Sequence, residues 1–301
     1  MPSTVMSSES ARIIRTGDEL VRVSDLAWAR PEDFGARKLV ILIHGFTAHG
    51  KYMRELGDFI QAFDFQAFVF NYNSYRGIAK AATNLRDFLL RYDGEVAGAI
   101  SRNGVFIIAH SMGGLVARSL AIIDEDQHFV RGMVLLGTPN DGCFSSARFL
   151  SYFIDYGEFL SGLMPEARNP ACLSAKELIK ADATDKPFIS VLNERWQKSF
   201  HRPPTLSISG GKRYLALSNN PLKNWLANRV IQGEIGQDDN DGLVTEKSVN
   251  MHSTMSLAED KRYRHFNDYP YYPDLNHTNL KENQTLALEI VKWFNELATG
   301  G

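Results

Sequence analysis

The chain has few cysteines, no long hydrophobic run and no excess of charge of either sign. Cys143 and Cys172 are the two cysteines in 301 residues, too few for a disulfide scaffold, and neither has the spacing of a metal site. We expect two reduced thiols, as in a cytosolic protein, with a single bridge between them as the alternative. Stability must then come from a hydrophobic core, for which 44% hydrophobic residues suffice.

Charge and hydropathy exclude further classes of protein. The chain has 33 Lys and Arg against 35 Asp and Glu, a formal charge of −2, which gives no overall field to attract nucleic acid or an anionic membrane. No apolar run approaches the roughly 18 residues that a membrane span needs. The Ser-rich residues 1–12 lack the basic and apolar regions of a secretory signal. We therefore expect a cytoplasmic protein with no nucleic-acid partner.

Short apolar runs alternate with segments of helical spacing. The runs are rich in branched and aromatic residues, as in strands buried on both faces, and cover 39–43, 67–70, 105–109 and 133–136. Apolar residues recur every three or four positions in 78–89, 115–123 and 286–297. This alternation predicts an α/β fold with a mostly parallel sheet covered by helices on both faces. A further strand is expected at 206–209, and the rest of 205–237 stays unassigned.

The most informative segment is 105–114, with the sequence VFIIAHSMGG. An apolar strand meets Ser111 and turns at once into a helix that begins at Met112. Ala109 and Gly113 are small, as a sharp strand-to-helix turn requires. Such a turn exposes the serine Oγ above the sheet, where the helix N-terminus offers free N–H groups to a developing oxyanion.

This segment resembles the nucleophile elbow of the α/β-hydrolases, and Ala109 in place of the usual glycine resembles a subgroup of bacterial lipases. The resemblance covers roughly residues 39–297 and implies the α/β-hydrolase fold. Segment 39–47, LVILIHGFT, resembles the strand and His-Gly loop of that fold. By this resemblance the oxyanion donors are the backbone amides of Phe46 and Met112. A single Gly45 argues against the glycine-triplet loop of the hormone-sensitive-lipase type.

A second motif, MVLLGTPNDG at 133–142, is similar to the Leu-Gly-Thr-Pro turn of lipases and inositol-deacylase-like hydrolases. In those families the following segment forms a lid, and here it is rich in aromatic residues. The resemblance implies that Tyr152, Phe153 and Phe159 contact substrate, whereas an ordinary core helix is the alternative. We therefore divide the chain into a first part of the core at 1–142, a helical lid at 143–185 and a second part of the core at 186–301.

A serine nucleophile needs a histidine base and an orienting carboxylate, which follow it in the chain order Ser, acid, His. The best acid is Asp241, in the sequence DDNDGLV at 238–244, which resembles the acid loop of lipases. Asp238 and Asp239 are rivals. The acidic cluster has two other interpretations, a solvated turn or a cation site.

The base predicted by position is His277, in a polar loop that enters the C-terminal helix. His252 and His265 also follow Asp241, but their charged surroundings indicate a solvent-facing position. His44 and His110 adjoin the oxyanion loop and the nucleophile, and their chain positions favour a supporting hydrogen-bonding role.

These residues predict a carboxylic ester hydrolase, an esterase or a lipase, that acts through an acyl-enzyme without a cofactor or a metal. A thioesterase, amidase or acyltransferase would share the triad, and a non-catalytic binding protein is a less favoured alternative. A dinucleotide-dependent dehydrogenase is excluded because no Gly-x-Gly-x-x-Gly follows an early strand. The expected partner is a small ester or lipid, with transient contact to lipid aggregates.

Overall fold

The computed structural model describes residues 18–34, 37–143, 173–178, 188–216, 219–250, 263–265 and 274–299. Within them, no helix has the length and apolar character to cross a membrane. The predicted lid residues Tyr152, Phe153 and Phe159 lie outside these ranges, as does Cys172. The lid, the three-part division of the chain and the state of the thiols therefore remain predictions.

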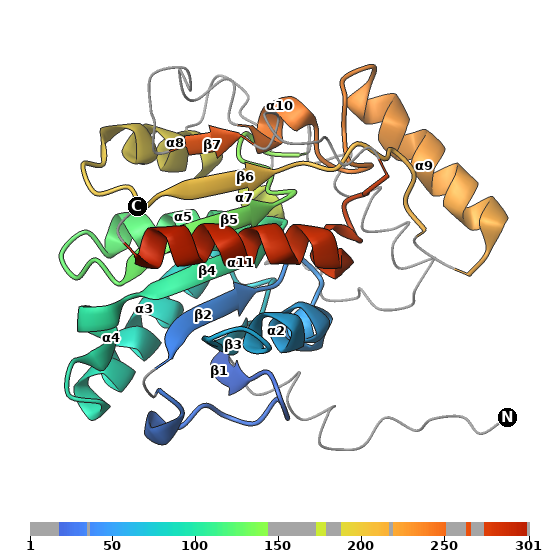
Figure 1. Cartoon of the computed structure of the whole chain (residues 1–301). Helices are drawn as coiled ribbons and strands as arrows, with labels where there is room; N and C mark the ends of the chain where they lie inside the picture. Colours follow the sequence, from blue (N-terminus) through green and yellow to red (C-terminus); the bar gives the residue numbers. More distant parts are fainter. Residues whose placement is uncertain are drawn as a thin grey trace, which may run out of the picture.

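One sheet organises the described part of the chain (Figure 1). Its strands lie in the order β1-β3-β2-β4-β5-β6-β7, and every neighbouring pair is parallel except β1 with β3. The strands are β1 (Glu19–Arg22), β2 (Lys38–Ile43), β3 (Phe65–Asn71), β4 (Val105–His110), β5 (Val130–Leu136), β6 (Thr205–Ile208) and β7 (Tyr263–His265). The mostly parallel sheet predicted from the apolar runs is confirmed.

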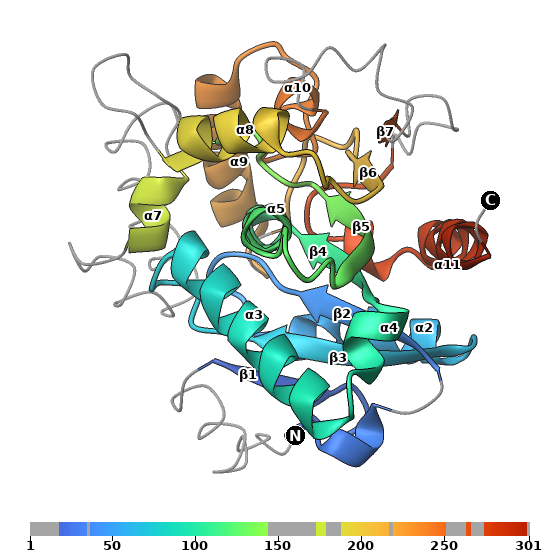
Figure 2. The same cartoon turned by 90° about the vertical axis from the view of Figure 1, so that its left-hand side faces the viewer.

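Helices cover both faces of this sheet, as Figure 2 shows. One face packs against α3 (Ile78–Glu95), α5 (Met112–Ile123) and α8 (Phe188–Lys198), and the other against α2 (Arg54–Gln61) and α11 (Gln284–Ala298). The alternation of side chains along a strand creates the two cores: Leu39 and Ile41 of β2 belong to the first, Val40 and Leu42 to the second. The remaining helices are α4 (Ala99–Asn103), α7 (Leu173–Glu177), α9 (Pro221–Ile235) and α10 (Glu246–Val249), with 3-10 turns η1 (Pro31–Asp33), η2 (Gly50–Met53) and η4 (Leu280–Glu282).

The predicted helical segments correspond to α3, α5 and α11, and each predicted strand corresponds to one of β2 to β6. The elements without a predicted counterpart include β1, β7, α2, α4, α8 and α10. The unassigned part of 205–237 contains α9, whose N-cap residue Asn220 accepts hydrogen bonds from the amides of Leu222 and Lys223.

Parallel strands bring their carboxyl ends to one edge of the sheet, so the segments that follow β2, β4, β5 and β6 gather there. The loop with Gly45 follows β2, Ser111 follows β4, and Gly137 follows β5. The fold thus places the predicted oxyanion loop, the predicted nucleophile and the Leu-Gly-Thr-Pro turn at a single edge.

The helix that begins after Ser111 is fastened at its other end by a buried carboxyl group. Asp124, the C-cap residue of α5, accepts a hydrogen bond at Oδ2 from the amide of Phe129 (2.6 Å), which closes the turn toward β5. Burial is the main reason why the pKa of Asp124 is raised to about 6.

Replacing Asp124 by Asn keeps an acceptor for the Phe129 amide and removes the titration. The pKa of Asp124 is higher in the folded protein than in the unfolded chain, so its protonation stabilises the fold. This stabilisation is fully present below the unfolded-state pKa and is lost as pH rises through about 6. We expect the free energy of unfolding of Asp124→Asn, relative to wild type, to increase by roughly 1 kcal/mol from about pH 4 to about pH 7. Urea unfolding at both pH values measures this, and a difference independent of pH would contradict it.

Candidate active site

Ser111 stands at the strand-to-helix turn expected from the sequence. β4 ends at His110, α5 begins at Met112, and Ser111 between them has φ 55° and ψ −129°, a conformation that a non-glycine residue rarely adopts. The turn brings the start of α5 against the end of β2. A Cβ on Gly113 would lie 2.6 Å from the carbonyl oxygens of Ile43 and His44, which explains the small residue there.

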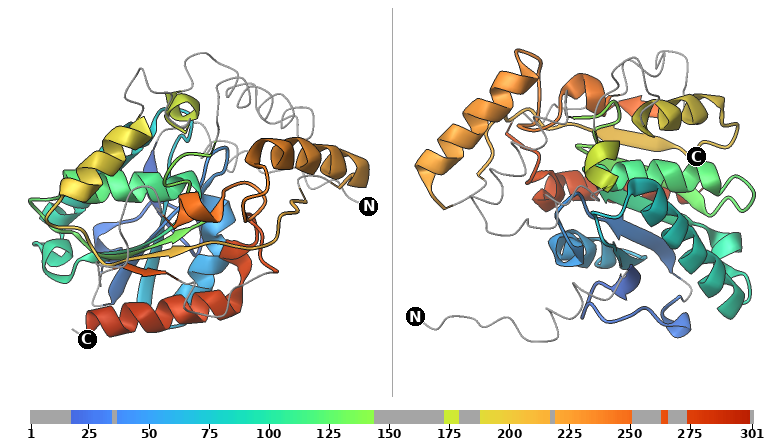
Figure 3. Two further views of the ribbon diagram at one scale, coloured as in Figure 1. Left: turned by 90° about the horizontal axis from the view of Figure 1, so that it is seen from above. Right: turned by 180° about the vertical axis from the view of Figure 1, so that it is seen from behind.

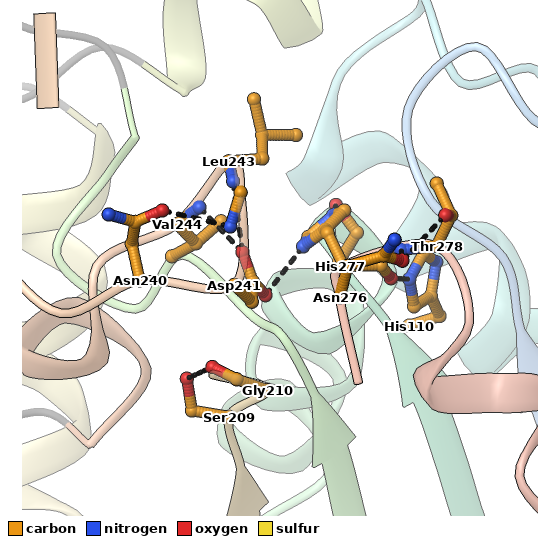
Figure 4. A network of polar contacts seen from close by, with 12 residues as sticks. His110, Ser209, Gly210, Asn240, Asp241, Leu243, Val244, Asn276, His277 and Thr278 are labelled. Carbon is orange, nitrogen blue, oxygen red and sulfur yellow. Dashed lines mark hydrogen bonds and ion pairs between the residues drawn. The ribbon is translucent and has the colours of Figure 1, made fainter. Parts of the chain in front are cut away.

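The structure brings Ser111, His277 and Asp241 into one hydrogen-bonded line. Ser111 Oγ lies 2.9 Å from His277 Nε2, and His277 Nδ1 lies 2.8 Å from Asp241 Oδ2. The His277 amide also donates to the carbonyl oxygen of Asp241 (2.7 Å). Two segments that are 36 residues apart in the chain are therefore joined through both backbone and side chain (Figure 4).

Backbone amides orient the Asp241 carboxylate toward the histidine. Its Oδ1 accepts hydrogen bonds from the amides of Val244 (2.8 Å) and Leu243 (3.1 Å), so Oδ2 is left to face His277 (Figure 4). Asp241 is fully buried and His277 is nearly so, whereas Ser111 is partly exposed. This arrangement keeps water from the carboxylate–imidazole pair and leaves the serine accessible.

The rival acids lie at the surface. Asp239 pairs with Arg213 (3.0 Å), and Asp238 pairs with Lys247 (2.8 Å). The carboxylate that faces His277 Nδ1 is that of Asp241. The calcium alternative has no set of ligands: among the described residues, no group of three His, Cys, Asp or Glu side chains is arranged to hold a metal. Of the rival histidines, His252 is outside the described residues, and the structure does not describe the side chain of His265.

His110 and His44 take the supporting positions predicted for them. His110 Nε2 donates to the carbonyl oxygen of His277 (2.7 Å), and burial together with the nearby His277 lowers the pKa of His110 well below its usual value. His44 stacks on Tyr72 with ring centroids 4.4 Å apart, and burial lowers the pKa of His44 to about 4. Both rings are therefore neutral at physiological pH, and neither adds a positive charge that would oppose an imidazolium at His277.

The loop after β2 passes directly beside the serine. A Cβ on Gly45 would lie 2.9 Å from Ser111 Cβ and 3.4 Å from Ser111 Oγ, so only glycine allows this approach. The amides of Phe46 and Met112, the predicted oxyanion donors, have no hydrogen-bond acceptor within the described part of the chain. Met112 is the first residue of α5, and the first amides of a helix have no intrahelical acceptor.

Gly137 also lies at the site, although its sequence pattern indicates only a tight turn after a strand. Its φ is +58°, and an added Cβ would lie 2.8 Å from Asp241 Oδ2 and 2.9 Å from His277 Nδ1. Gly137 therefore supports the Asp241–His277 pair from the end of β5. Its place in the Leu-Gly-Thr-Pro motif was the available signal, but the contact itself is visible only in three dimensions.

The chain was compared with known families and structures. The model of the "Alpha/beta hydrolase family" matches residues 40–275. A lipase from Bacillus licheniformis in its mature form is 14% identical, with a TM-score of 0.60 over 86% of this chain and 92% of that one. An esterase from Exiguobacterium antarcticum is 13% identical (TM-score 0.55, 92% and 94% covered), and a gene product of Listeria innocua is 15% identical (TM-score 0.53, 87% and 94% covered).

A comparison with curated protein sequences gave no match. At the low identities of the solved structures, their likeness establishes the fold alone, and it agrees with the α/β-hydrolase fold predicted from the sequence.

Substituting Gly137 by Ala should disturb the buried pair without removing any of its atoms. The new methyl group displaces the Asp241 carboxylate or the His277 ring, so we expect Ser111 to react with a fluorophosphonate at least about tenfold more slowly. Mass spectrometry of the labelled protein measures the rate. The control is Gly94→Ala in α3, where a Cβ meets nothing within 4 Å. Equal labelling rates in the two variants would refute this role.

Proposed function

The chain belongs to the alpha/beta hydrolase family, and on that premise we propose that it hydrolyses carboxylic esters through an acyl-enzyme intermediate. The observation that carries this proposal is the line of hydrogen bonds from Ser111 Oγ through His277 to Asp241. A serine hydroxyl is a weak nucleophile, and an imidazole nitrogen at 2.9 Å is placed to take its proton during attack.

In the proposed reaction, Ser111 Oγ attacks the ester carbonyl carbon while its proton passes to His277 Nε2. Asp241 fixes the Nδ1–H tautomer and stabilises the imidazolium that forms. The amides of Phe46 and Met112 would donate to the oxyanion, and their lack of acceptors in the described part of the chain is consistent with that role. His277 then returns the proton to the alcohol, which leaves.

Water then hydrolyses the acyl-enzyme, and the proton transfers through His277 are repeated. His277 takes a proton from water, the hydroxide attacks the acyl carbonyl, and the carboxylic acid leaves as Ser111 regains its proton. Each proton thus moves through one nitrogen, Nε2, while Nδ1 keeps its bond to Asp241. Asp241 accepts three hydrogen bonds, two from backbone amides and one from His277, and these contacts fix its carboxylate beside the imidazole.

Thioesters, amides and acyl acceptors other than water would use the same intermediate. Esters are favoured by the Leu-Gly-Thr-Pro turn, which resembles that of lipases, and by the lipase and the esterase among the similar structures. A non-catalytic binding role is disfavoured because it would need neither the rare backbone conformation of Ser111 nor a buried carboxylate aimed at His277.

The nucleophile is tested with p-nitrophenyl acetate, butyrate and octanoate. We expect wild type to hydrolyse at least one of them and Ser111→Ala to lose turnover with its fold intact. Relative kcat/KM across the three esters then measures the preferred acyl length. A folded wild type that is inactive on all three would overturn the ester proposal and favour thioester or amide substrates, or binding alone.

The acid is tested with a matched pair of substitutions in one loop. Asp241→Asn removes the charge beside His277 and permits the wrong tautomer, so we expect kcat to fall about 10³-fold or more. Asp239→Asn removes an exposed charge paired with Arg213 and should leave kcat within about twofold. Steady-state hydrolysis of the preferred ester measures both values. Similar losses in the two variants would mean that Asp241 is not the orienting acid.

A further inference from the structure

The helix α9 buries polar residues beside two apolar ones, Ala227 and Ile231, and exposes its other large apolar residues. Asn228 is buried and exchanges hydrogen bonds with the backbone of Leu215, accepting from its amide and donating to its carbonyl oxygen (2.8 Å each). Gln232 and Asn240 form a second amide pair (3.2 Å). These polar contacts hold α9 in place together with Ala227 and Ile231, which are buried on the same side of the helix.

The exposed apolar residues of α9 form a continuous stripe. They lie three and four positions apart along the helix, and their exposed fractions are between 40% and 65%: Leu222, Trp225, Leu226 and Val230. Figures 1 and 3 show that α9 projects beyond the sheet and its covering helices. The stripe is a clustered apolar surface rather than a set of scattered exposed residues.

The charge of this region differs from that of the whole chain. Residues 210–235, which include all of α9, contain one acidic residue, Glu234, and four basic ones, in a chain whose formal charge is −2: Lys212, Arg213, Lys223 and Arg229. Arg213 pairs with Asp239, which lies outside the stretch. The guanidinium of Arg229 lies 5.3 Å from the ring centre of Trp225, so a cation adjoins the largest apolar side chain of the stripe.

We propose that the apolar stripe of α9 docks on an anionic lipid surface, with the basic side chains beside it contacting the headgroups. An exposed helix side that carries Trp and Leu, with Lys and Arg next to them, matches the chemistry of a lipid–water interface. A twofold contact with a second copy would place Lys223 and Arg229 of both chains near each other, which disfavours self-association.

The position of α9 connects this surface to the site. α9 ends at Ile235, and the loop that follows carries Asp241. Asn240 bonds Gln232 of the helix and accepts from the amide of Gly242 in the loop. This inference rests on the proposed ester hydrolase function: docking through α9 would bring the enzyme to esters held in lipid aggregates. The near-neutral charge of the whole chain gives no indication of this local basic and apolar surface.

Binding is tested by sedimentation with sucrose-loaded vesicles made of equal parts phosphatidylglycerol and phosphatidylcholine, against vesicles of phosphatidylcholine alone. We expect wild type to bind the anionic vesicles more tightly than the neutral ones. The double variant Leu222→Ser, Trp225→Ser should weaken binding about tenfold or more. Lys223→Gln with Arg229→Gln should weaken binding to anionic vesicles by about tenfold and change neutral binding little.

The matched control is Phe200→Ser. Phe200 is 90% exposed and precedes the amino end of β6, whereas α9 follows the carboxyl end of that strand. This variant should bind vesicles as wild type does. Hydrolysis of p-nitrophenyl butyrate below its solubility limit should stay within about twofold of wild type in all variants, because none of the substituted residues contacts the Ser111–His277–Asp241 line.

Three results would overturn the proposal: no vesicle binding by wild type, equal binding by the Leu222→Ser, Trp225→Ser variant, or a wild-type dimer in sedimentation velocity that this variant dissociates. Failure of the ester function is distinguishable from all three. In that case wild type lacks p-nitrophenyl ester hydrolysis, while vesicle binding still depends on Leu222 and Trp225.

Discussion

The hydrogen bond between Asp241 and His277 joins the parts of the chain that must meet for the site to exist. It links two loops that have no strand pairing with each other, and both partners are buried. A buried carboxylate is costly unless its lone pairs are satisfied, and here the amides of Leu243 and Val244 and the imidazole satisfy them. The geometry of His277 toward Ser111 therefore depends on the acid loop, which bonds both its side chain and its backbone amide.

Close backbone approach is the second constraint, and glycine meets it on three sides of the site. Gly45 lets the loop after β2 pass Ser111, Gly113 lets α5 start against the end of β2, and Gly137 lets the end of β5 lie beside the Asp241–His277 pair. Each position has space for a hydrogen atom and none for a methyl group. The motifs around the site are therefore packing requirements as much as chemical ones.

The predictable parts of the structure are those with a local signal. Apolar runs revealed β2 to β6, because parallel strands are buried on both faces, and the turn at Ser111 with the order Ser, acid, His identified the three residues that meet. β7 has three residues, too few for a periodic pattern, and β1 has the sequence ELVR, in which only two of four residues are apolar. The role of Gly137 could not be predicted, because it depends on which side chains lie beside its missing Cβ.

The helix α9 was missed for a physical reason that also explains its surface. Periodicity identifies a helix when its apolar side faces the core, but α9 is seated by Asn228 and Gln232, whose partners are backbone and amide groups. On the inner side of α9, Asn224 and Asn228 are buried beside Ala227 and Ile231, which interrupts the apolar pattern, and Leu222 and Trp225 stay exposed. The same amide pair joins α9 to the loop of Asp241, in which two backbone amides and full burial hold the carboxylate in place.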